Sequence, residues 1–377
     1  MIPLSVPNLS GNEWKYVKDC LDTNWVSSVG SYVNQFEELA AKFSSVTRAV
    51  ATVNGTSALH ISLILSGVQR DDLVILPNIT FVAPANVIKY MGADPILMDV
   101  DEHTWQLDIA LLTRFFEQEC LIKEDTCHHK NTGRRISAII PVHVLGNMVN
   151  MEKLLPLADY YKIKVIEDAT EALGSTYKGK PAGSFGLFGC LSYNGNKIIT
   201  TGGGGMILTN DKELGEKAKH LTTQAKADPL EYYHDEIGYN YRLVNILAAI
   251  GVAQMEQLPA FIDRKRNVSE LYTRELKDVP GFKPQVITEH VNPNCWLFTC
   301  CFENSKGLLK YLNDNGVQTR PFWVPMNQLP PFKNDLYFHV DDIAGSVYKS
   351  CLSMPCSTNI SDKEVIEVSN KIKEFYA

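Results

Sequence analysis

Several features that this sequence lacks exclude whole classes of protein. Its 377 residues hold no run of about 18 apolar residues, the length that a membrane-spanning helix needs. The N-terminal residues carry neither a basic segment nor a long apolar core, so we expect no signal peptide. The formal net charge of −7 gives no overall attraction for nucleic acid. Internal repeats and low-complexity segments are also missing. We therefore expect a cytoplasmic globular protein without a nucleic-acid or membrane partner.

The nine cysteines include no CxxC pair, which argues against a zinc site. Because no secretory signal is expected, we predict reduced thiols. The segment Asp125-Thr126-Cys127-His128-His129 contains ligand-type side chains, but no second cluster of ligands accompanies it. We therefore predict a solvated loop there and no bound metal.

Between about residues 48 and 210, short β-rich runs alternate with helical patterns. The predicted strands cover residues 49–53, 72–76, 95–98, 137–142 and 164–167, and the predicted helices cover 57–65, 84–90 and 151–161. This alternation predicts an α/β domain with a mostly parallel sheet and right-handed crossovers. Ligands of such domains bind beyond the carboxyl ends of the strands.

The pattern changes near residue 255. An apolar helix over residues 244–257 is expected to end at Pro259, and a charged helix over 261–276 follows it. A strand at 296–302 and helices at 306–313 and 362–376 complete the chain. We therefore predict a large α/β domain over residues 1–255 and a smaller α+β domain over 256–377.

Asn54-Gly55-Thr56-Ser57 follows a predicted strand and opens a predicted helix. Gly55 permits a tight turn, and Thr56 or Ser57 can cap the helix. The free N–H groups at a helix N-terminus suit a phosphate. The same four residues also suit an ordinary strand–helix turn, so this segment alone leaves both interpretations open.

A second candidate is Asp168, which ends the apolar strand Ile166-Glu167-Asp168. One interpretation is the N-cap of a helix. The other is a carboxylate that keeps the pyridine nitrogen of pyridoxal phosphate (PLP) protonated, so that the ring can act as an electron sink.

A third candidate is Lys197, which lies in a polar loop between an apolar run and the four glycines 202–205. Most lysines lie on the surface, but a run of glycines costs conformational entropy and indicates close approach of the backbone to another group. A lysine amine can form a Schiff base with an aldehyde, and its neighbours can lower its pKa until it acts as a base.

Taken together, these segments resemble the PLP-dependent nucleotide-sugar aminotransferases of the DegT/StrS family, which have fold type I. The resemblance covers nearly all of the chain. Its segments are Asn24 to Ser27, Asn54 to Leu59, Thr80 to Ala83, Pro141 to His143, Glu167 to Ala169, Ser192 to Lys197 and Gly238 to Arg242. The resemblance implies PLP as the cofactor, a large mostly parallel-sheet domain with a smaller C-terminal α+β domain, and a homodimer with shared active sites.

The resemblance also implies roles for single residues. Lys197 matches the lysine that binds PLP covalently, Asp168 the carboxylate at the pyridine nitrogen, and His143 a histidine near the ring. Glu171 stands where the family usually has a glutamine near the phenolic oxygen of PLP. Cofactor contacts are further implied for Gly55, Thr56, Ser57 and Ser192, and for Asn240 from the other subunit.

For the substrate side, the resemblance implies Trp25 and the segment from Arg320 to Asn327, in which Arg320, Trp323 and Asn327 are the candidates. The family more often has a histidine where this chain has Asn327. Phe81 is interpreted either as a ring that lies against the cofactor or as a core phenylalanine.

The amino-acid sequence of the chain resembles those of aminotransferases of legionaminic acid pathways. The expected reaction transfers an amino group from L-glutamate to C4 of a UDP-linked 2-acetamido-4-keto-2,6-dideoxy hexose, giving UDP-4-amino-4,6-dideoxy-N-acetylglucosamine or its epimer. Alternatives are the same reaction on a GDP- or dTDP-linked keto sugar, amino-acid transamination with Arg320 as a carboxylate clamp, and a non-catalytic binding protein. Lys197 argues against the related sugar dehydratases, in which a histidine replaces the lysine.

Overall fold

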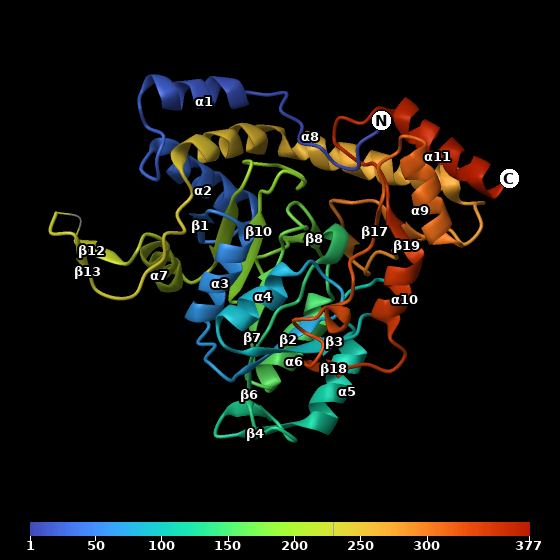
Figure 1. Cartoon of the computed structure of the whole chain (residues 1–377). Coiled ribbons are helices and arrows are strands. Elements are labelled where there is room, and N and C mark those ends of the chain that lie inside the picture. The colour runs from blue at the N-terminus through green and yellow to red at the C-terminus, as the bar shows by residue number, and fades with distance from the viewer. Residues whose placement is uncertain (229) are drawn as a thin grey trace.

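The computed structural model describes residues 1–228 and 230–377 (Figure 1). Its ten-stranded sheet has the order β1-β11-β10-β7-β6-β2-β3-β18 along its main path, with β4 and β5 attached beside β6. The strands of the main path are β1 (Arg48–Thr52), β2 (Leu73–Pro77), β3 (Asp94–Met98), β6 (Arg135–Ile139), β7 (Lys164–Asp168), β10 (Phe188–Ser192), β11 (Gly205–Thr209) and β18 (Leu336–Phe338). All neighbours from β10 to β18 pair in parallel, whereas β11 is antiparallel to β10 and β1. The predicted α/β fold with a mostly parallel sheet is confirmed.

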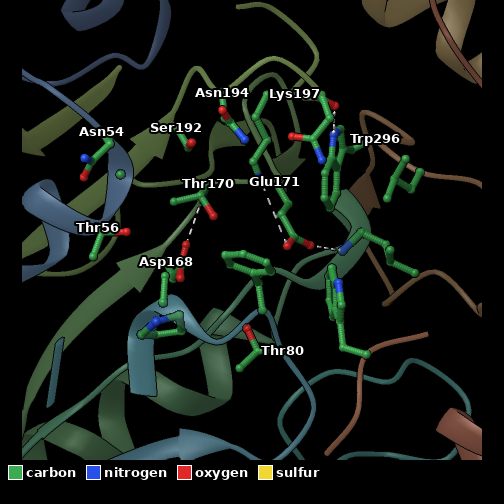
Figure 2. A pocket seen from close by; sticks show the side chains of 18 of the residues that line it. Asn54, Thr56, Thr80, Asp168, Thr170, Glu171, Ser192, Asn194, Lys197 and Trp296 are labelled. Carbon is green, nitrogen blue, oxygen red and sulfur yellow. Dashed lines mark hydrogen bonds and ion pairs between the residues drawn. The ribbon is translucent and has the colours of Figure 1, made fainter. Parts of the chain in front are cut away.

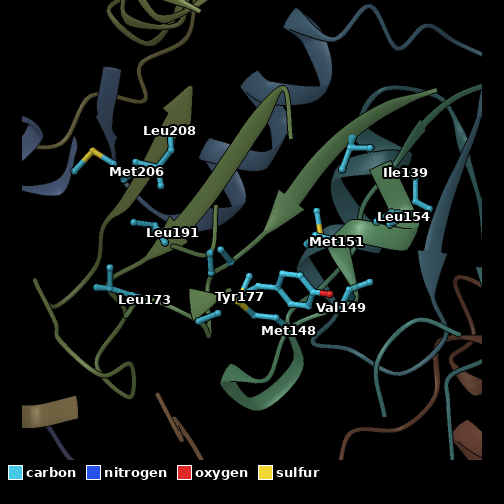
Figure 3. Packing of buried hydrophobic residues seen from close by; sticks show 14 of the residues in the cluster. Ile139, Met148, Val149, Met151, Leu154, Leu173, Tyr177, Leu191, Met206 and Leu208 are labelled. Atoms are coloured by element: carbon cyan, nitrogen blue, oxygen red, sulfur yellow. The ribbon is translucent and has the colours of Figure 1, made fainter. Parts of the chain in front are cut away.

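Buried side chains lie on both faces of this sheet because successive strand residues point in opposite directions. On β2, Leu73 and Ile75 belong to one hydrophobic cluster, whereas Val74 and Leu76 belong to another. The first cluster includes residues of α2 (Ser31–Phe43), α5 (Ile109–Glu119) and α6 (Met151–Tyr160), and the second includes residues of α3 (Gly55–Leu65), α4 (Ala83–Tyr90) and α7 (Lys212–Thr222). Figure 3 shows part of the first cluster, with side chains from β10, β11 and α6.

The C-terminal part is built around a second sheet of four antiparallel strands in the order β14-β16-β19-β17. A third hydrophobic cluster lies there and also takes in Ile2 from the N-terminus. The elements are α8 (Asn245–Leu276), β14 (Lys283–Pro284), β16 (Thr299–Cys301), α9 (Ser305–Asp314), β17 (Arg320–Pro321), α10 (Ile343–Ser350), β19 (Cys351–Ser353) and α11 (Asp362–Tyr376). Within the described residues, no helix combines the length and the apolar character needed to cross a membrane.

The expectation that a helix ends at Pro259 is wrong. The single helix α8 continues through this residue, although proline removes one backbone hydrogen bond from a helix. Packing offsets that loss, since Val252 and Leu258 are buried in the first cluster and Val268 is buried in the third. The predicted domain boundary at residues 255/256 falls inside α8, and the division into two domains stays a prediction.

The remaining elements are short, apart from the N-terminal helix. They are α1 (Glu13–Asp22), β4 (Cys120–Lys123), β5 (Thr126–His129), β8 (Thr176–Tyr177), β9 (Lys180–Pro181), β12 (Lys226–Asp228), β13 (Tyr233–His234), β15 (Val291–Asn292) and the 3-10 turns η1 (Val144–Gly146) and η2 (Met326–Gln328). The predicted solvated loop at 125–129 is wrong, because β5 pairs with both β4 and β6. Buried and partly exposed side chains alternate along β5, with Cys127 and His129 buried, as expected for a strand with one face toward the core.

The expectation of reduced thiols stays a prediction. Cys301 on β16 and Cys351 on β19 are register partners, and their sulfur atoms face each other. The two residues lie 50 positions apart in sequence, so spacing alone did not indicate the pairing. The other seven cysteines are free thiols.

Candidate active site

A cavity of about 690 Å³ lies where β7 and β10 end and α3 begins (Figure 2). One wall comes from the segments that follow these strands, and the other comes from Trp296 and residues 320–324. The predicted site residues that line it are Gly55, Thr56, Phe81, Asp168, Glu171, Ser192, Lys197, Arg320 and Trp323. The structure therefore brings together residues that lie up to 268 positions apart in sequence (323 − 55).

Helix α3 points its N-terminus at the cavity. Asn54 is the N-cap, and its Oδ1 accepts a hydrogen bond of 2.8 Å from the backbone N–H of Ser57. The N–H groups of the first helical turn have no partner within the helix, so Gly55 and Thr56 offer donors to an anion. Ser57 contributes to the cap but is not among the residues that line the cavity.

Two glycines allow the backbone to pack closely at this helix end. A Cβ on Gly205 of β11 would lie 2.4 Å from the carbonyl of Asn54 and 2.7 Å from the nitrogen of Gly55. A Cβ on Gly55 would lie 3.0 Å from the Ser192 side chain. At Gly205 the glycine run approaches the backbone at the start of α3, whereas its close approach to a ligand stays a prediction.

Asp168 is the last residue of β7 and is almost fully buried. Its Oδ1 accepts a hydrogen bond of 3.1 Å from the N–H of Thr170, so it caps the turn that follows. Burial raises the pKa of the Asp168 carboxyl, and the hydrogen bonds from Thr170 partly oppose that rise. A positively charged ligand group beside this carboxylate would stabilise its ionised form.

Lys197 lies in the loop after β10, and its side chain is 12% exposed. Backbone hydrogen bonds from Tyr193 to Gly204 and from Thr201 to Tyr193, of 2.8 and 2.9 Å, close the base of this loop. The N–H of Lys197 donates to the Asn194 carbonyl at 3.0 Å. Burial lowers the pKa of the Lys197 amine, although the carboxyls of Glu171 and Asp168 act in the opposite direction.

Glu171 has a side chain that is 1% exposed, and its Oε1 lies 4.0 Å from the Lys197 Nζ. Its Oε2 accepts a hydrogen bond of 2.7 Å from the N–H of Leu145, which has a φ of 62°. A positive φ is unfavourable for leucine, so this turn holds the carboxyl at the cost of some strain. Burial raises the pKa of Glu171 to about 7, and the charge of Lys197 limits that rise.

Trp296 faces these groups from the other wall (Figure 2). The Lys197 Nζ lies 3.9 Å from its ring centroid, and its Nε1 donates a hydrogen bond of 2.8 Å to the Asn196 carbonyl. The ring also stacks on Trp323, with centroids 6.3 Å apart and planes inclined by 24°. Nothing in its local sequence indicated this role for Trp296, since it follows Lys197 by 99 positions (296 − 197).

Phe81 is 55% exposed and lines the cavity, so the alternative of a core phenylalanine does not hold. Its neighbour Thr80 also lines the cavity, and the buried Oγ1 of Thr80 has no hydrogen-bond partner in the described part of the chain. A buried hydroxyl without a partner loses the hydrogen bonds that it would make in water, and a ligand can restore them. Thr80 stands in the segment that the family resemblance covers, although it was not singled out.

His143 is fully buried and is not among the residues that line the cavity. Its Nδ1 accepts a hydrogen bond of 3.3 Å from the N–H of Val149, and its Nε2 lies 3.0 Å from Oε2 of Glu167. Its backbone N–H donates to the Asp168 carbonyl at 3.0 Å. His143 therefore supports the Asp168 strand from behind instead of facing the cavity.

Three further predicted residues lie outside this cavity. Trp25 is 53% exposed, and its carbonyl accepts a hydrogen bond from the Asn245 side chain. Asn240 is exposed and forms an isolated bridge with Thr223. Asn327 exchanges hydrogen bonds of 3.1 and 3.0 Å with Asn78. Their proposed contacts with cofactor or substrate stay predictions.

Comparison with known proteins assigns this site to a family. The model of the DegT/DnrJ/EryC1/StrS aminotransferase family matches residues 7–373. The chain belongs to the DegT/DnrJ/EryC1/StrS aminotransferase family. Members of this family use PLP, and the chain is a nucleotide-sugar aminotransferase by family.

Two relatives and one solved structure illustrate the likeness of this DegT/StrS chain. GDP-perosamine synthase of Escherichia coli O157:H7 is 38% identical over 377 residues, which is 100% of this chain and 99% of that protein. GDP-perosamine synthase of Caulobacter vibrioides is 36% identical, covering 97% of this chain and 96% of that protein. The structure of Helicobacter pylori PseC, an aminotransferase involved in pseudoaminic acid biosynthesis, has a TM-score of 0.88 at 25% identity and covers 100% of this chain and 99% of that one.

The residues of this DegT/StrS cavity fit PLP. A phosphate suits the N–H groups of Gly55 and Thr56 at the start of α3, which line the cavity. A protonated pyridine nitrogen suits the buried carboxyl of Asp168. Among the described residues, no cationic side chain forms an ion pair with this carboxyl within 4.0 Å. An aldehyde carbon suits the amine of Lys197, whose pKa is lowered.

Proposed function

We propose that this protein transfers an amino group from L-glutamate to C4 of a GDP-linked 4-keto-6-deoxy hexose, giving a perosamine-type product. The observation that carries the proposal is that the Lys197 amine, whose side chain is only 12% exposed, and the buried carboxyl of Asp168 face one cavity of about 690 Å³. This arrangement provides a reactive amine and a carboxylate for a pyridine nitrogen, the two groups that PLP chemistry requires.

The choice of GDP rests on relatives. Three proteins that are 38, 36 and 33% identical to this chain, over nearly their whole length, are GDP-perosamine synthases. The sequence resemblance leads us to expect the UDP-linked 2-acetamido sugar of legionaminic acid pathways as the substrate. These relatives favour the GDP-linked alternative instead. One relative that is 31% identical over 308 residues is a UDP-4-amino-4-deoxy-L-arabinose–oxoglutarate aminotransferase, so the test below includes a UDP-linked sugar.

Bound PLP would supply an electron sink for the carbanion that forms when the donor loses its α-proton. The free amine of Lys197 then takes the proton from the α-carbon of the amino donor and later returns a proton to the sugar carbon. Burial lowers the pKa of the Lys197 amine, which increases its unprotonated fraction and so favours its action as the base in both steps.

Asp168 would keep the ring nitrogen of bound PLP protonated, and the N–H groups at the start of α3 would hold its phosphate. Phe81, being 55% exposed in the cavity, offers a flat apolar surface for a ring. Across the cavity, Arg320 and Trp323 are proposed to contact the nucleotide sugar, since a guanidinium suits the diphosphate and an indole suits the base.

We also propose that the active form is a cytoplasmic homodimer. Asn240 is exposed and lies outside the cavity of its own chain, as a residue that serves the second subunit's site would. Size-exclusion chromatography with light scattering measures the mass, and a mass near 42.2 kDa would contradict the dimer.

The decisive experiment is a product assay. Purified protein is incubated with PLP, L-glutamate and, separately, GDP-4-keto-6-deoxymannose, a UDP-linked 2-acetamido-4-keto-6-deoxy hexose or a dTDP-linked 4-keto-6-deoxy hexose. Mass spectrometry then detects replacement of the keto oxygen by an amino group, and formation of 2-oxoglutarate is measured in parallel.

Preferential amination of the GDP-linked sugar supports the proposal. Preferential amination of the UDP-linked sugar keeps the reaction and overturns the substrate assignment. If no sugar is aminated and L-glutamate leaves the visible absorbance of the PLP-loaded protein unchanged, the protein is a binding protein and the proposed reaction is wrong.

A further inference from the structure

The amine of Lys197 lies between two groups from different parts of the chain. On one side the carboxyl Oε1 of Glu171 is 4.0 Å from Nζ, and on the other the indole centroid of Trp296 is 3.9 Å from Nζ. Figure 2 shows the Lys197 side chain reaching toward Glu171, with Trp296 beside it. Both a carboxylate and the face of an indole attract an ammonium group.

Both partner groups are held rigidly. Glu171 is fixed through its Oε2 by the N–H of Leu145 at 2.7 Å. The carbonyl of Trp296 accepts a hydrogen bond of 2.8 Å from the buried Lys265 of α8, and its Nε1 binds the Asn196 carbonyl next to Lys197. Neither side chain has to become ordered when the amine lies between them, so no further conformational entropy is lost in forming the two contacts.

A single buried residue joins the two partner groups to each other. The Nδ2 of Asn294 donates hydrogen bonds to the carbonyls of Glu171 and Leu173, at 2.8 and 2.9 Å. Its Oδ1 accepts a hydrogen bond of 2.9 Å from the N–H of Trp296. Asn294 is fully buried, so the spacing between the acidic side and the aromatic side is fixed by the fold.

We propose that Glu171 and Trp296 are positioning residues that hold the Lys197 ammonium between a carboxylate and an indole face whenever its amine is free. The inference rests on the proposed role of Lys197 as the reactive amine. Glutamate at position 171 is a departure from the glutamine that the family resemblance leads us to expect, and the charge of the carboxylate is what distinguishes the two.

The consequence is a defined balance of charge around the amine. Burial favours the neutral amine, whereas Glu171 and Trp296 both favour the ammonium form. The other charged side chains that line the cavity are Asp168 and Arg320, and Lys265 lies behind Trp296 with its Nζ bound to the carbonyls of Trp296 and Cys356. The carboxyl of Glu171 itself has a pKa of about 7, so its attraction develops above that pH.

The pKa of the free amine can be measured without any nucleotide sugar. The PLP-free full chain is treated with trace acetic anhydride between pH 5.5 and 10, and acetylation of Lys197 is quantified by mass spectrometry of its peptide. The exposed Lys153 of α6 serves as the internal reference for reagent decay. Because only the neutral amine reacts, the midpoint of the labelling curve reports the pKa of Lys197.

Removing either partner should lower that midpoint. Glu171→Gln is expected to lower it by about one pH unit, which raises labelling about tenfold on the acid side of the wild-type midpoint. The effect should be confined to pH values above about 7, where the carboxyl is ionised. Trp296→Leu is expected to lower the midpoint by about half to one pH unit. Trp296→Phe is expected to lower it by less, since phenylalanine binds cations more weakly than tryptophan.

Trp323→Leu is the matched control, because this ring stacks on Trp296 but is not the ring over Nζ. Its labelling midpoint should equal that of the wild type. In the PLP-loaded enzyme, the rate at which L-glutamate removes the visible absorbance should show an acid limb displaced in the same direction by Glu171→Gln.

Equal midpoints for wild type, Glu171→Gln and both Trp296 variants would overturn the proposal, as would equal shifts in all variants including Trp323→Leu. Trp296→Phe and Glu171→Gln keep the test decisive if Trp296→Leu fails to fold. Displaced midpoints together with no amination of any sugar would leave this inference standing and remove only the proposed substrate.

Discussion

The two walls of the cavity differ in how the chain builds them. The wall that carries Lys197, Asp168 and Gly55 consists of short segments, each of which follows a strand of the parallel sheet. The opposite wall takes Trp296 and Arg320 from separate segments of the C-terminal part. Strand ends of a parallel sheet converge by topology, whereas the second wall depends on long-range packing, which buries Trp296 and Phe322 in the second hydrophobic cluster. The first wall should therefore supply the reacting groups, and the second wall, apart from Trp296 beside the Lys197 amine, should govern the choice of substrate.

The strongest test of the comparison is Lys197→Ala. Loss of the amine should abolish multiple turnovers, since proton transfer by a positioned base contributes about 10² to 10⁴-fold and covalent binding of PLP is lost as well. The thermal unfolding midpoint of the PLP-free protein should change little, because the neighbouring carboxyl of Glu171 can take up a proton when the lysine is removed. A variant that still completes many turnovers would sink the assignment of Lys197.

Asp168→Ala should cost about 100-fold in kcat, because the ring nitrogen loses the charge that keeps it protonated. The measurement is the steady-state rate of 2-oxoglutarate formation at saturating PLP. Activity near that of the wild type would mean that another acid serves the ring. Asp168→Glu provides the comparison in which the charge is kept and only its position changes.

Gly205→Ala tests the backbone of the first wall. The added methyl group would collide with Asn54 and Gly55, so the start of α3 must move. We expect a loss of about 1–3 kcal/mol in the free energy of unfolding and a weaker affinity for PLP. Denaturant unfolding and PLP titration measure the two effects. Gly133→Ala, where a Cβ would meet nothing within 4 Å but φ is 69°, shows the cost of positive φ alone.

The smallest effect is expected in the second wall. Trp323→Ala should raise KM for the nucleotide sugar by about tenfold, the scale of losing one aromatic contact, while kcat for amination stays within about twofold. Initial rates over a range of sugar concentrations separate the two constants. A large fall in kcat with an unchanged KM would show that Trp323 takes part in the chemistry and would break the comparison.

The same difference explains what the sequence could predict. The parallel sheet, the start of α3 and the residues Asp168 and Lys197 could be located because each lies in or beside a local pattern of strand, turn and helix, whereas Glu171 was indicated by the family resemblance. Trp296 could not, since its place depends on the long-range hydrogen bonds from Lys265 to its carbonyl and from the neighbouring Asn294 to Glu171. His143 was placed in the cavity by resemblance, but it lies behind Asp168, because burial and its bond to Glu167 turn it away.

Local patterns also failed where packing decides the outcome. Proline normally ends a helix, yet α8 continues through Pro259 because hydrophobic residues on both sides are buried. The polar segment 125–129 forms a strand since β4 and β6 offer partners on both of its edges. Neither partner strand is visible from the segment's own composition.

The continuity of α8 has a consequence for unfolding. One helix of 32 residues contributes buried side chains to both the first and the third hydrophobic cluster. Neither cluster can melt without exposing part of this helix, so the N-terminal and C-terminal parts are coupled in free energy. A scanning calorimeter should therefore record one cooperative endotherm for the whole chain, and expression of either part alone should give a protein that exposes half of α8 and aggregates.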